Sequence, residues 1–398
     1  MELLRRKGKT PIFSVLHDTR GVPFADKILS SNPYMNPALL AEDRFDMKLD
    51  GQQVDCAALA DCGTLLMYGS GARLVFMTLR VGTAVDLMPG ELQSSMSTVS
   101  SCAFCSAWDR SSPTLAVAAL AARVLILDLA GARSIRELEA PCEVRACAVA
   151  PRAAMSSPEL RVAACDATGT LIIWVVQVAD RQANSNLPVT MMIPALPSPG
   201  SITSGWSSPI FVGATTVAAA ATDGVSLWNT SDTTYVSETR RVIVAADSAA
   251  ERALLLRADL SSSGRLLVVD ASACARVWDV QRDAVLCTLS AADGQQQSSV
   301  RDACWSRSGR LICTLQGRDE LTLFSAHTGV RIHEVRHRGH QFHVCVSLSP
   351  DDNDALDTRE LWVLGLGTHR SSLEFFAQKL PLLDWHQKCW AVSDEANV

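Results

Sequence analysis

The chain is short of several residue types and patterns that would mark particular classes of protein. Only 6% of its 398 residues are aromatic and 20% are charged, and its net charge of −6 speaks against a broad nucleic-acid-binding face. The longest apolar run, LAVAALAARVLILDLAG, is interrupted by Arg123 and Asp128, so it is too short for a membrane span. The first residues, MELLRRKGKTP, lack the apolar core of a secretory signal. We therefore expect a cytoplasmic protein, with the nucleus as the alternative location, and no membrane span.

The sequence also lacks the residue patterns that carry common kinds of catalysis. No G-x-S-x-G elbow of a hydrolase is present. Cys102 and Cys105 form a lone C-x-x-C without a second pair at zinc-site spacing, so we expect both thiols in the core, on opposite sides of a strand. The 13 cysteines are scattered through strand-like runs, which fits small buried side chains in a reducing compartment. We predict no enzyme, no cofactor and no small-molecule substrate.

Residues 333–337 spell H-E-x-x-H, the pattern of zinc proteases. That chemistry needs a helix, which places both histidines on one face. Here the flanking alternation predicts a strand, along which residues four apart are separated by about 13 Å. We therefore assign His333 and Glu334 to a strand and predict no metal site. A looser metal site in a loop, with His337, His340 and His343 joining His333, is the weaker alternative.

What the chain has is a repeat. The clearest copy runs from Asp302 to Val335 and reads as four short strands separated by turns that contain Gly309, Gly317 and Gly329. Six further copies begin at Val54, Ser101, Arg145, Trp206, Leu256 and Phe342.

One large apolar position near the end of each third predicted strand aligns the copies. Successive aligned positions are 51, 47, 54, 50, 46 and 51 residues apart, a steadier period than chance would produce. These positions are Phe76, Leu127, Trp174, Trp228, Trp278, Phe324 and Phe375.

Seven copies of four strands predict an all-β fold, a single seven-bladed β-propeller of four-stranded antiparallel blades. One such blade cannot bury its apolar faces alone, whereas blades stacked radially cover one another. We expect an irregular N-terminal arm over residues 1–50 and the propeller over residues 51–398. As the outer strand that closes the last blade we favour residues 11–16 over residues 388–392. The stretch 179–205, rich in Pro, Ser and Asn, is expected to form an extended surface loop.

The copies resemble the WD-repeat family. ARVWD at 275–279 is similar to the Trp-Asp ending of a repeat, and SSSGRLLVV and SRSGRLICT look like its turn and second strand. Gly339-His340 resembles the Gly-His pair that opens a repeat. The resemblance is specific over roughly residues 255–350 and looser over 54–255. It implies structural roles, in a shared hydrogen-bond set, for His340, Asp166, Asp270, Trp174 and Trp278.

The resemblance implies a non-catalytic scaffold for protein–protein interaction, a WD-repeat subunit of a larger intracellular assembly. In this family the turns between second and third strands share one face, so we predict partner contacts for Arg318, His369 and Arg370. The extended loops at 178–205 and 289–300 are further candidate docking elements.

Two alternatives stay open. Some WD-repeat substrate-receptor adaptors of cullin-type ubiquitin ligases carry Trp-Asp-x-Arg at a blade end, and here Arg282 follows Trp278-Asp279 one place late. The other alternative is a non-catalytic subunit of an RNA-processing or RNA-modifying complex. The sequence does not name the partner.

Overall fold

The fold is taken from a computed structural model. The structure describes residues 44–49, 55–60, 65–78, 83–86, 98–105, 115–129, 133–152, 159–178, 188–194, 207–221, 224–231, 237–242, 253–258, 264–270, 275–289, 300–305, 309, 311–316, 320–336, 341–348, 360–369 and 372–381. Within these ranges every regular element is a β-strand.

The strands form seven four-stranded antiparallel sheets, and the four strands of each sheet follow one another from the inside of the ring outward. The innermost strands are β2 (Cys56–Leu59), β6 (Val99–Phe104), β10 (Val144–Val149), β14 (Ser207–Phe211), β18 (Ala253–Ala258), β22 (Val300–Trp305) and β26 (Gln341–Leu348). The second strands are β3 (Leu65–Ser70), β7 (Leu115–Leu120), β11 (Glu159–Asp166), β15 (Thr216–Ala221), β19 (Arg265–Asp270), β23 (Leu311–Gln316) and β27 (Glu360–His369).

The third strands are β4 (Arg73–Thr78), β8 (Arg123–Asp128), β12 (Leu171–Gln177), β16 (Gly224–Asn229), β20 (Ala275–Asp279), β24 (Glu320–Ser325) and β28 (Ser372–Pro381). The outer strands are β5 (Thr83–Asp86), β9 (Arg133–Glu139), β13 (Val189–Ile193), β17 (Ser237–Val242), β21 (Ala284–Leu289), β25 (Arg331–Arg336) and β1 (Arg44–Leu49).

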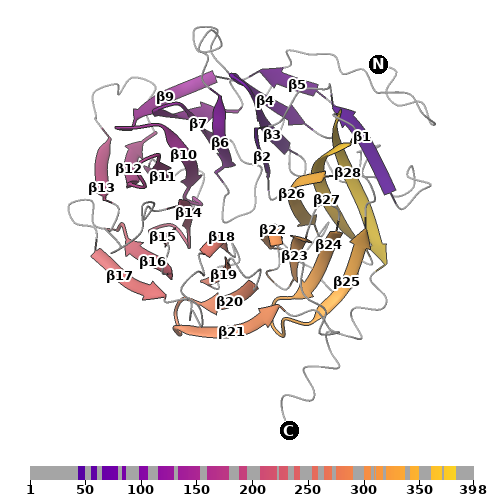
Figure 1. Ribbon diagram of the computed structural model, residues 1–398. Coiled ribbons are helices and arrows are strands. Elements are labelled where there is room, and N and C mark those ends of the chain that lie inside the picture. The colour runs from indigo at the N-terminus through magenta and orange to yellow at the C-terminus, as the bar shows by residue number, and fades with distance from the viewer. Residues whose placement is uncertain are drawn as a thin grey trace.

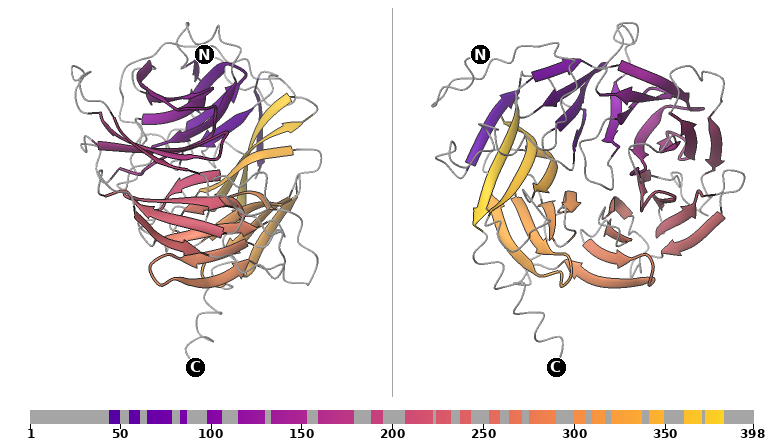
Figure 2. Two further views of the ribbon diagram at one scale, coloured as in Figure 1. Left: turned by 60° about the vertical axis from the view of Figure 1, so that its left-hand side comes forward. Right: turned by 180° about the vertical axis from the view of Figure 1, so that it is seen from behind.

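The sheets follow one another around a common centre (Figure 1). Each innermost strand contacts the innermost strand of the next sheet, and β26 contacts β2, so the series closes on itself. The view from behind shows the same order, with the indigo first sheet beside the yellow last one (Figure 2). The predicted all-β class and the antiparallel propeller arrangement are confirmed.

The core lies between adjacent sheets, which explains why the second strands are apolar almost throughout. In β7 all six side chains are buried. Ala116 and Ala118 pack towards the preceding sheet, whereas Val117 and Ala119 pack towards the following one. Because successive strand residues point to opposite faces, a strand covered on both faces needs apolar residues at every position.

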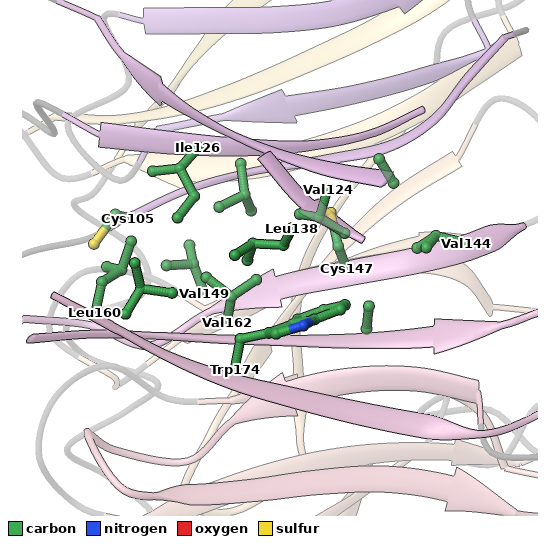
Figure 3. Close-up of a cluster of buried hydrophobic side chains, with 14 of the residues drawn as sticks. Cys105, Val124, Ile126, Leu138, Val144, Cys147, Val149, Leu160, Val162 and Trp174 are labelled. Atoms are coloured by element: carbon green, nitrogen blue, oxygen red, sulfur yellow. The ribbon is translucent and has the colours of Figure 1, made fainter. Parts of the chain in front are cut away.

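Figure 3 shows the cluster between the sheet β6–β9 and the sheet β10–β13. Ile126 and Leu138 come from one sheet, and they face Val162 and Trp174 from the other. Trp174 is only 1% exposed, so its indole is a central part of the contact between these two sheets.

The alignment of the repeats is confirmed strand by strand. All of the positions that set the predicted period lie on third strands. Trp174 pairs with Val162, Trp228 with Val217 and Phe324 with Ile312, always on the neighbouring second strand. The period therefore reports one structural unit for each copy.

The outer strand of the last sheet differs from the one we expected. β1, Arg44–Leu49, pairs antiparallel with β28 along its whole length, so a segment from the expected N-terminal arm belongs to the ring. Residues 11–16 and 388–392 lie outside the described residues. β1 alternates Phe45, Met47 and Leu49 with charged residues, a strand pattern that we overlooked.

The expected surface loop 179–205 also needs correction. β13 lies inside it and pairs with β12 as the outer strand of its sheet. Val189 and Met192 are 42% and 53% exposed. The prolines on either side of β13 suggested a loop, but an outer strand tolerates nearby prolines because only one of its edges is paired.

Candidate functional site

One end of the ring gathers the turns between second and third strands together with the links from each outer strand to the next innermost strand. We call this end the turn face. Antiparallel neighbours place these connections at the same end of every sheet. Its described parts are the turns at 71–72, 121–122 and 167–170 and the link at 140–143.

Backbone hydrogen bonds between sheets hold the turn face. The Val99 amide donates to the Gly71 carbonyl over 2.8 Å, and the Val144 amide donates to the Ala121 carbonyl over 2.8 Å. Both acceptors adopt positive φ, 58° at Gly71 and 50° at Ala121. At these two junctions, the first residue of the innermost strand is thus bonded to the turn of the preceding sheet, which fixes these turns relative to each other.

Charged side chains of both signs gather on the turn face over the sheets β6–β9 and β10–β13. Arg123 and Glu137 form an ion pair of 3.1 Å, and both side chains remain more than two-fifths exposed. Glu139, Glu143 and Arg145 are exposed beside them. We missed this group in the sequence, because its residues belong to β8, β9, β10 and the link between β9 and β10, which the fold brings together.

Asp166 ends β11 and organises the next turn of the turn face. Its Oδ1 accepts hydrogen bonds from the Thr168 amide at 2.9 Å, the Thr168 hydroxyl at 2.6 Å and the Thr170 amide at 2.9 Å. The carboxylate is buried, with Asp166 only 2% exposed. These bonds fix the turn that leads into β12, where Trp174 lies buried.

Asp270 and Trp278 occupy the same places on their sheet. Asp270 ends β19 and Trp278 lies on β20. The Trp278 ring nitrogen is buried and has no hydrogen-bond partner among the described residues. His340 lies outside the described residues, so the role that the resemblance implies for it stays a prediction.

The three predicted partner contacts belong to turns of the turn face. Arg318 lies in the link between β23 and β24. His369 ends β27, and Arg370 follows it before β28 begins at Ser372. Arg318 and Arg370 themselves lie outside the described residues, and no contact of the His369 side chain is described, so the contact role of all three stays a prediction.

Residues 333–336 of the H-E-x-x-H pattern lie on the strand β25, as predicted, and not on a helix. His333 pairs with Leu323 of β24 along the backbone, and His343 lies on another strand, β26. Among the residues that the structure describes, no group of three His, Cys, Asp or Glu side chains could hold a metal ion.

The core positions predicted for Cys102 and Cys105 are confirmed. Cys102 is 9% exposed and packs towards the preceding sheet, and Cys105 is 3% exposed and packs towards the following one. Burial raises the pKa of Cys105 to about 12. The nine cysteines whose side chains the structure describes are all free thiols.

The face opposite the turn face carries the turn that follows the Trp-Asp ending. The Asp279 carboxylate accepts from the amides of Gln281 and Arg282, each over 2.9 Å. The Arg282 side chain is 78% exposed, 3.7 Å from the Asp279 carboxylate. In the described ranges, no helix is long and apolar enough to cross a membrane.

No model of a known protein family matches the chain, and no curated protein matches it by sequence. Among solved structures it is similar to the β-propeller domain of Cps50 (Swd1) from Myceliophteria thermophila. The TM-score is 0.59 and the identity 13%, over 82% of this chain and 98% of that one. In all, 1347 chains of solved structures match, so the likeness establishes a β-propeller fold and no particular activity.

Proposed function

We propose that this β-propeller is a non-catalytic scaffold that binds other proteins through its turn face, as a WD-repeat-like subunit of a larger assembly in the cytoplasm or nucleus. The observation that carries the proposal is the charged group of Arg123, Glu137, Glu139, Glu143 and Arg145, which lies on β8, β9, β10 and the link between β9 and β10, beside turns that backbone hydrogen bonds connect. A surface whose turns are already ordered pays little conformational entropy when a partner binds.

The rest of the turn face extends the same proposal. Its seven sheets would act as the blades of one closed propeller and present a ring of turns. Arg318, His369 and Arg370 fall in or beside the links between second and third strands of the sheets β22–β25 and β26–β1, and the two arginines would add positive charge to the same face. Mixed charge of this kind favours orientation and selection of a partner over raw affinity.

The test is purification of the tagged full-length chain from cells, with mass spectrometry of what accompanies it. We expect stoichiometric protein partners. The triple variant Glu139→Lys, Glu143→Lys, Arg145→Glu should weaken their recovery by about tenfold or more, because like charges across an interface are costly.

The matched control is Arg282→Glu, a charge reversal on the opposite face, which should leave recovery unchanged. A monomer without partners, or partners that ignore the turn-face variant, would contradict the proposal. Stable RNA-modifying enzymes among the partners would instead select the RNA-processing alternative.

One observation favours a second candidate, the substrate-receptor adaptor of a cullin-type ubiquitin ligase. Arg282 lies three residues after Asp279 of the Trp-Asp ending, and its side chain is 78% exposed while paired with the Asp279 carboxylate, so a partner can reach it on the face opposite the turn face. In that case Arg282→Glu, and not the turn-face variant, would remove cullin-type ligase components from the purified complex.

A further inference from the structure

Two thiols meet where the first two sheets of the ring touch. Cys56 lies on the innermost strand β2 and Cys102 on the innermost strand β6, and their sulfur atoms are 3.8 Å apart in a hydrogen bond. The Cys56 thiol also contacts the Val99 carbonyl oxygen at 3.4 Å, and the Cys102 thiol contacts the Met67 carbonyl oxygen at 3.8 Å. Both sulfur atoms are therefore held in place by their neighbours.

The surroundings leave room for these sulfur atoms. A Cβ at Gly69 would lie 2.8 Å from the Cys56 sulfur and 2.8 Å from the Val99 Cβ. The glycine opposite Cys56 in the β2–β3 pairing thus makes space for the thiol. Cys56 is half-buried and Cys102 is buried, so an oxidant from solvent reaches Cys56 first.

The junction between the second and third sheets shows which residues replace Cys56 and Cys102 at the equivalent positions. Cys56 pairs with Gly69 and Ser101 with Ala119, each the residue before the last one of its second strand. Cys102 and Cys147 likewise correspond, because each pairs with the third residue from the end of its second strand. There the Ser101 hydroxyl accepts from the Cys147 amide over 3.2 Å. The first junction therefore has a thiol where the second has a hydroxyl.

We propose that Cys56 and Cys102 form a reversible redox site, in which a hydroperoxide converts the thiol pair into a disulfide that joins the first two sheets. This proposal stands on the geometry of the pair and does not depend on the proposed function.

The chemistry balances in two steps. The Cys56 thiolate attacks the hydroperoxide, the O–O bond breaks, and a sulfenic acid and an alkoxide or hydroxide form. The Cys102 sulfur then attacks the Cys56 sulfur and displaces hydroxide, which leaves as water with the Cys102 proton. Both sulfur atoms are oxidised and the peroxide is reduced. A small-molecule thiol reverses the change by exchange.

The environment favours Cys56 as the sulfur that reacts with peroxide. The pKa of Cys56 is lowered, first because Cys102 can donate a hydrogen bond to its thiolate. The pKa of Cys102 is raised by that same bond and by burial. Cys56 therefore suits the role of the attacking thiolate, and Cys102 that of the resolving thiol.

The disulfide would lie directly beneath the turn face. The Gly71 amide donates to the carboxylate of Asp55, the neighbour of Cys56, over 2.7 Å, and the Gly71 carbonyl accepts from Val99. A covalent link here ties β2 to β6 just below these bonds. Oxidation should therefore raise the melting temperature and slow amide exchange at the β3–β4 turn.

The experiment treats the reduced full-length protein with a small excess of hydrogen peroxide, followed by non-reducing digestion and peptide mass mapping. We expect a cross-linked peptide pair that contains Cys56 and Cys102, and its loss after treatment with dithiothreitol. Cys102→Ser should instead leave a sulfenic acid at Cys56 that dimedone labels.

Matched variants locate the chemistry. Cys147→Ser, at the corresponding buried cysteine of the next junction, should leave the link intact. Ser101→Cys in a Cys56→Ser background should move the link to Cys147. If peroxide yields no Cys56–Cys102 link in the wild-type protein, or links only Cys304 to Cys313, which face each other across β22 and β23, the proposal is wrong.

Discussion

Among the glycines that the structure describes, Gly329 has the least room for a side chain against neighbouring backbone. It lies in the turn between β24 and β25 with φ +71°, and a Cβ there would collide with the Thr288 carbonyl oxygen and lie 2.9 Å from its carbon. Thr288 belongs to β21 of the preceding sheet. Glycine is thus required twice, by its own backbone conformation and by the backbone of a neighbouring sheet.

We predict that Gly329→Ala lowers the free energy of unfolding by about 3 kcal/mol, since a left-handed alanine and an overpacked contact both cost energy. Urea denaturation measures the loss. The matched control is Gly71→Ala, whose φ is +58° but whose Cβ would meet nothing within 4 Å. It should cost about 1 kcal/mol, and equal losses in the two variants would show that the contact with Thr288 does not matter.

Buried thiols make the stability depend on pH in the alkaline range. Burial raises the pKa of Cys147 to about 12, against about 8.5 in an unfolded chain. Below the unfolded pKa, both states keep the proton and the stabilisation is fully present. As pH rises above it, only the unfolded chain loses the proton, so stability falls until pH passes the folded pKa.

We therefore predict that the free energy of unfolding falls between about pH 9 and 11, and that Cys147→Ala reduces this slope by up to about 1.4 kcal/mol per pH unit. Urea denaturation across a pH series measures the slope. Leu138 lies in the same buried cluster but has no thiol, so Leu138→Ala should lower the free energy of unfolding by the same amount at every pH. A Cys147→Ala curve parallel to the wild type would contradict the prediction.

The strands β11 and β19 each carry an arginine whose side chain donates a hydrogen bond to the following sheet. The Arg161 guanidinium donates to the Ala214 carbonyl at 3.4 Å, and the Arg265 guanidinium donates to the Gly309 carbonyl at 2.6 Å. Both carbonyls lie in the turn between the first and second strands of the following sheet. Arg161 precedes Asp166 by the same number of residues that separates Arg265 from Asp270, so the two contacts occupy equivalent positions of their sheets.

Arg265→Met tests the contact of Arg265 with the following sheet. The change removes the bond to Gly309 and the contact with the Trp305 ring, whose centroid lies 5.1 Å from the guanidinium carbon. We expect a loss of about 2 kcal/mol, measured by thermal or urea unfolding. Arg123→Met removes only an exposed ion pair and should cost less than about 1 kcal/mol. If Arg265→Met lowers the free energy of unfolding no more than Arg123→Met does, Arg265 does not stabilise the contact between the two sheets.

A strand could be predicted from the sequence where its pattern lies within its own segment, and not where it depends on pairing with a distant segment. β11–β12 and β19–β20 could be recognised because the spacing from Asp166 to Trp174 recurs from Asp270 to Trp278. β13 could not, because its short run between prolines becomes a strand only through pairing with β12. The meeting of Cys56 with Cys102 was equally hidden, since it depends on how two sheets pack and on no pattern within either segment.

Across the whole molecule, the ring depends on a strand that precedes all the others. β1 pairs with β28 from Arg44↔Gln378 to Leu49↔Leu373, which joins the two ends of the described chain in one sheet. β26 of that sheet contacts β2 of the first. Closure therefore rests both on the contact between innermost strands and on the backbone pairing of β1 at the rim.

Removal of residues 1–50 should consequently destabilise the protein more than the loss of one edge strand elsewhere. Without β1, the ten-residue strand β28 presents an unpaired edge, which invites pairing with another chain. We expect a lower melting temperature and concentration-dependent aggregation, seen by calorimetry and light scattering. The matched control removes residues 1–42 and keeps β1, and it should behave as the full chain. If the two truncations are equally stable and monodisperse, β1 does not close the ring in solution.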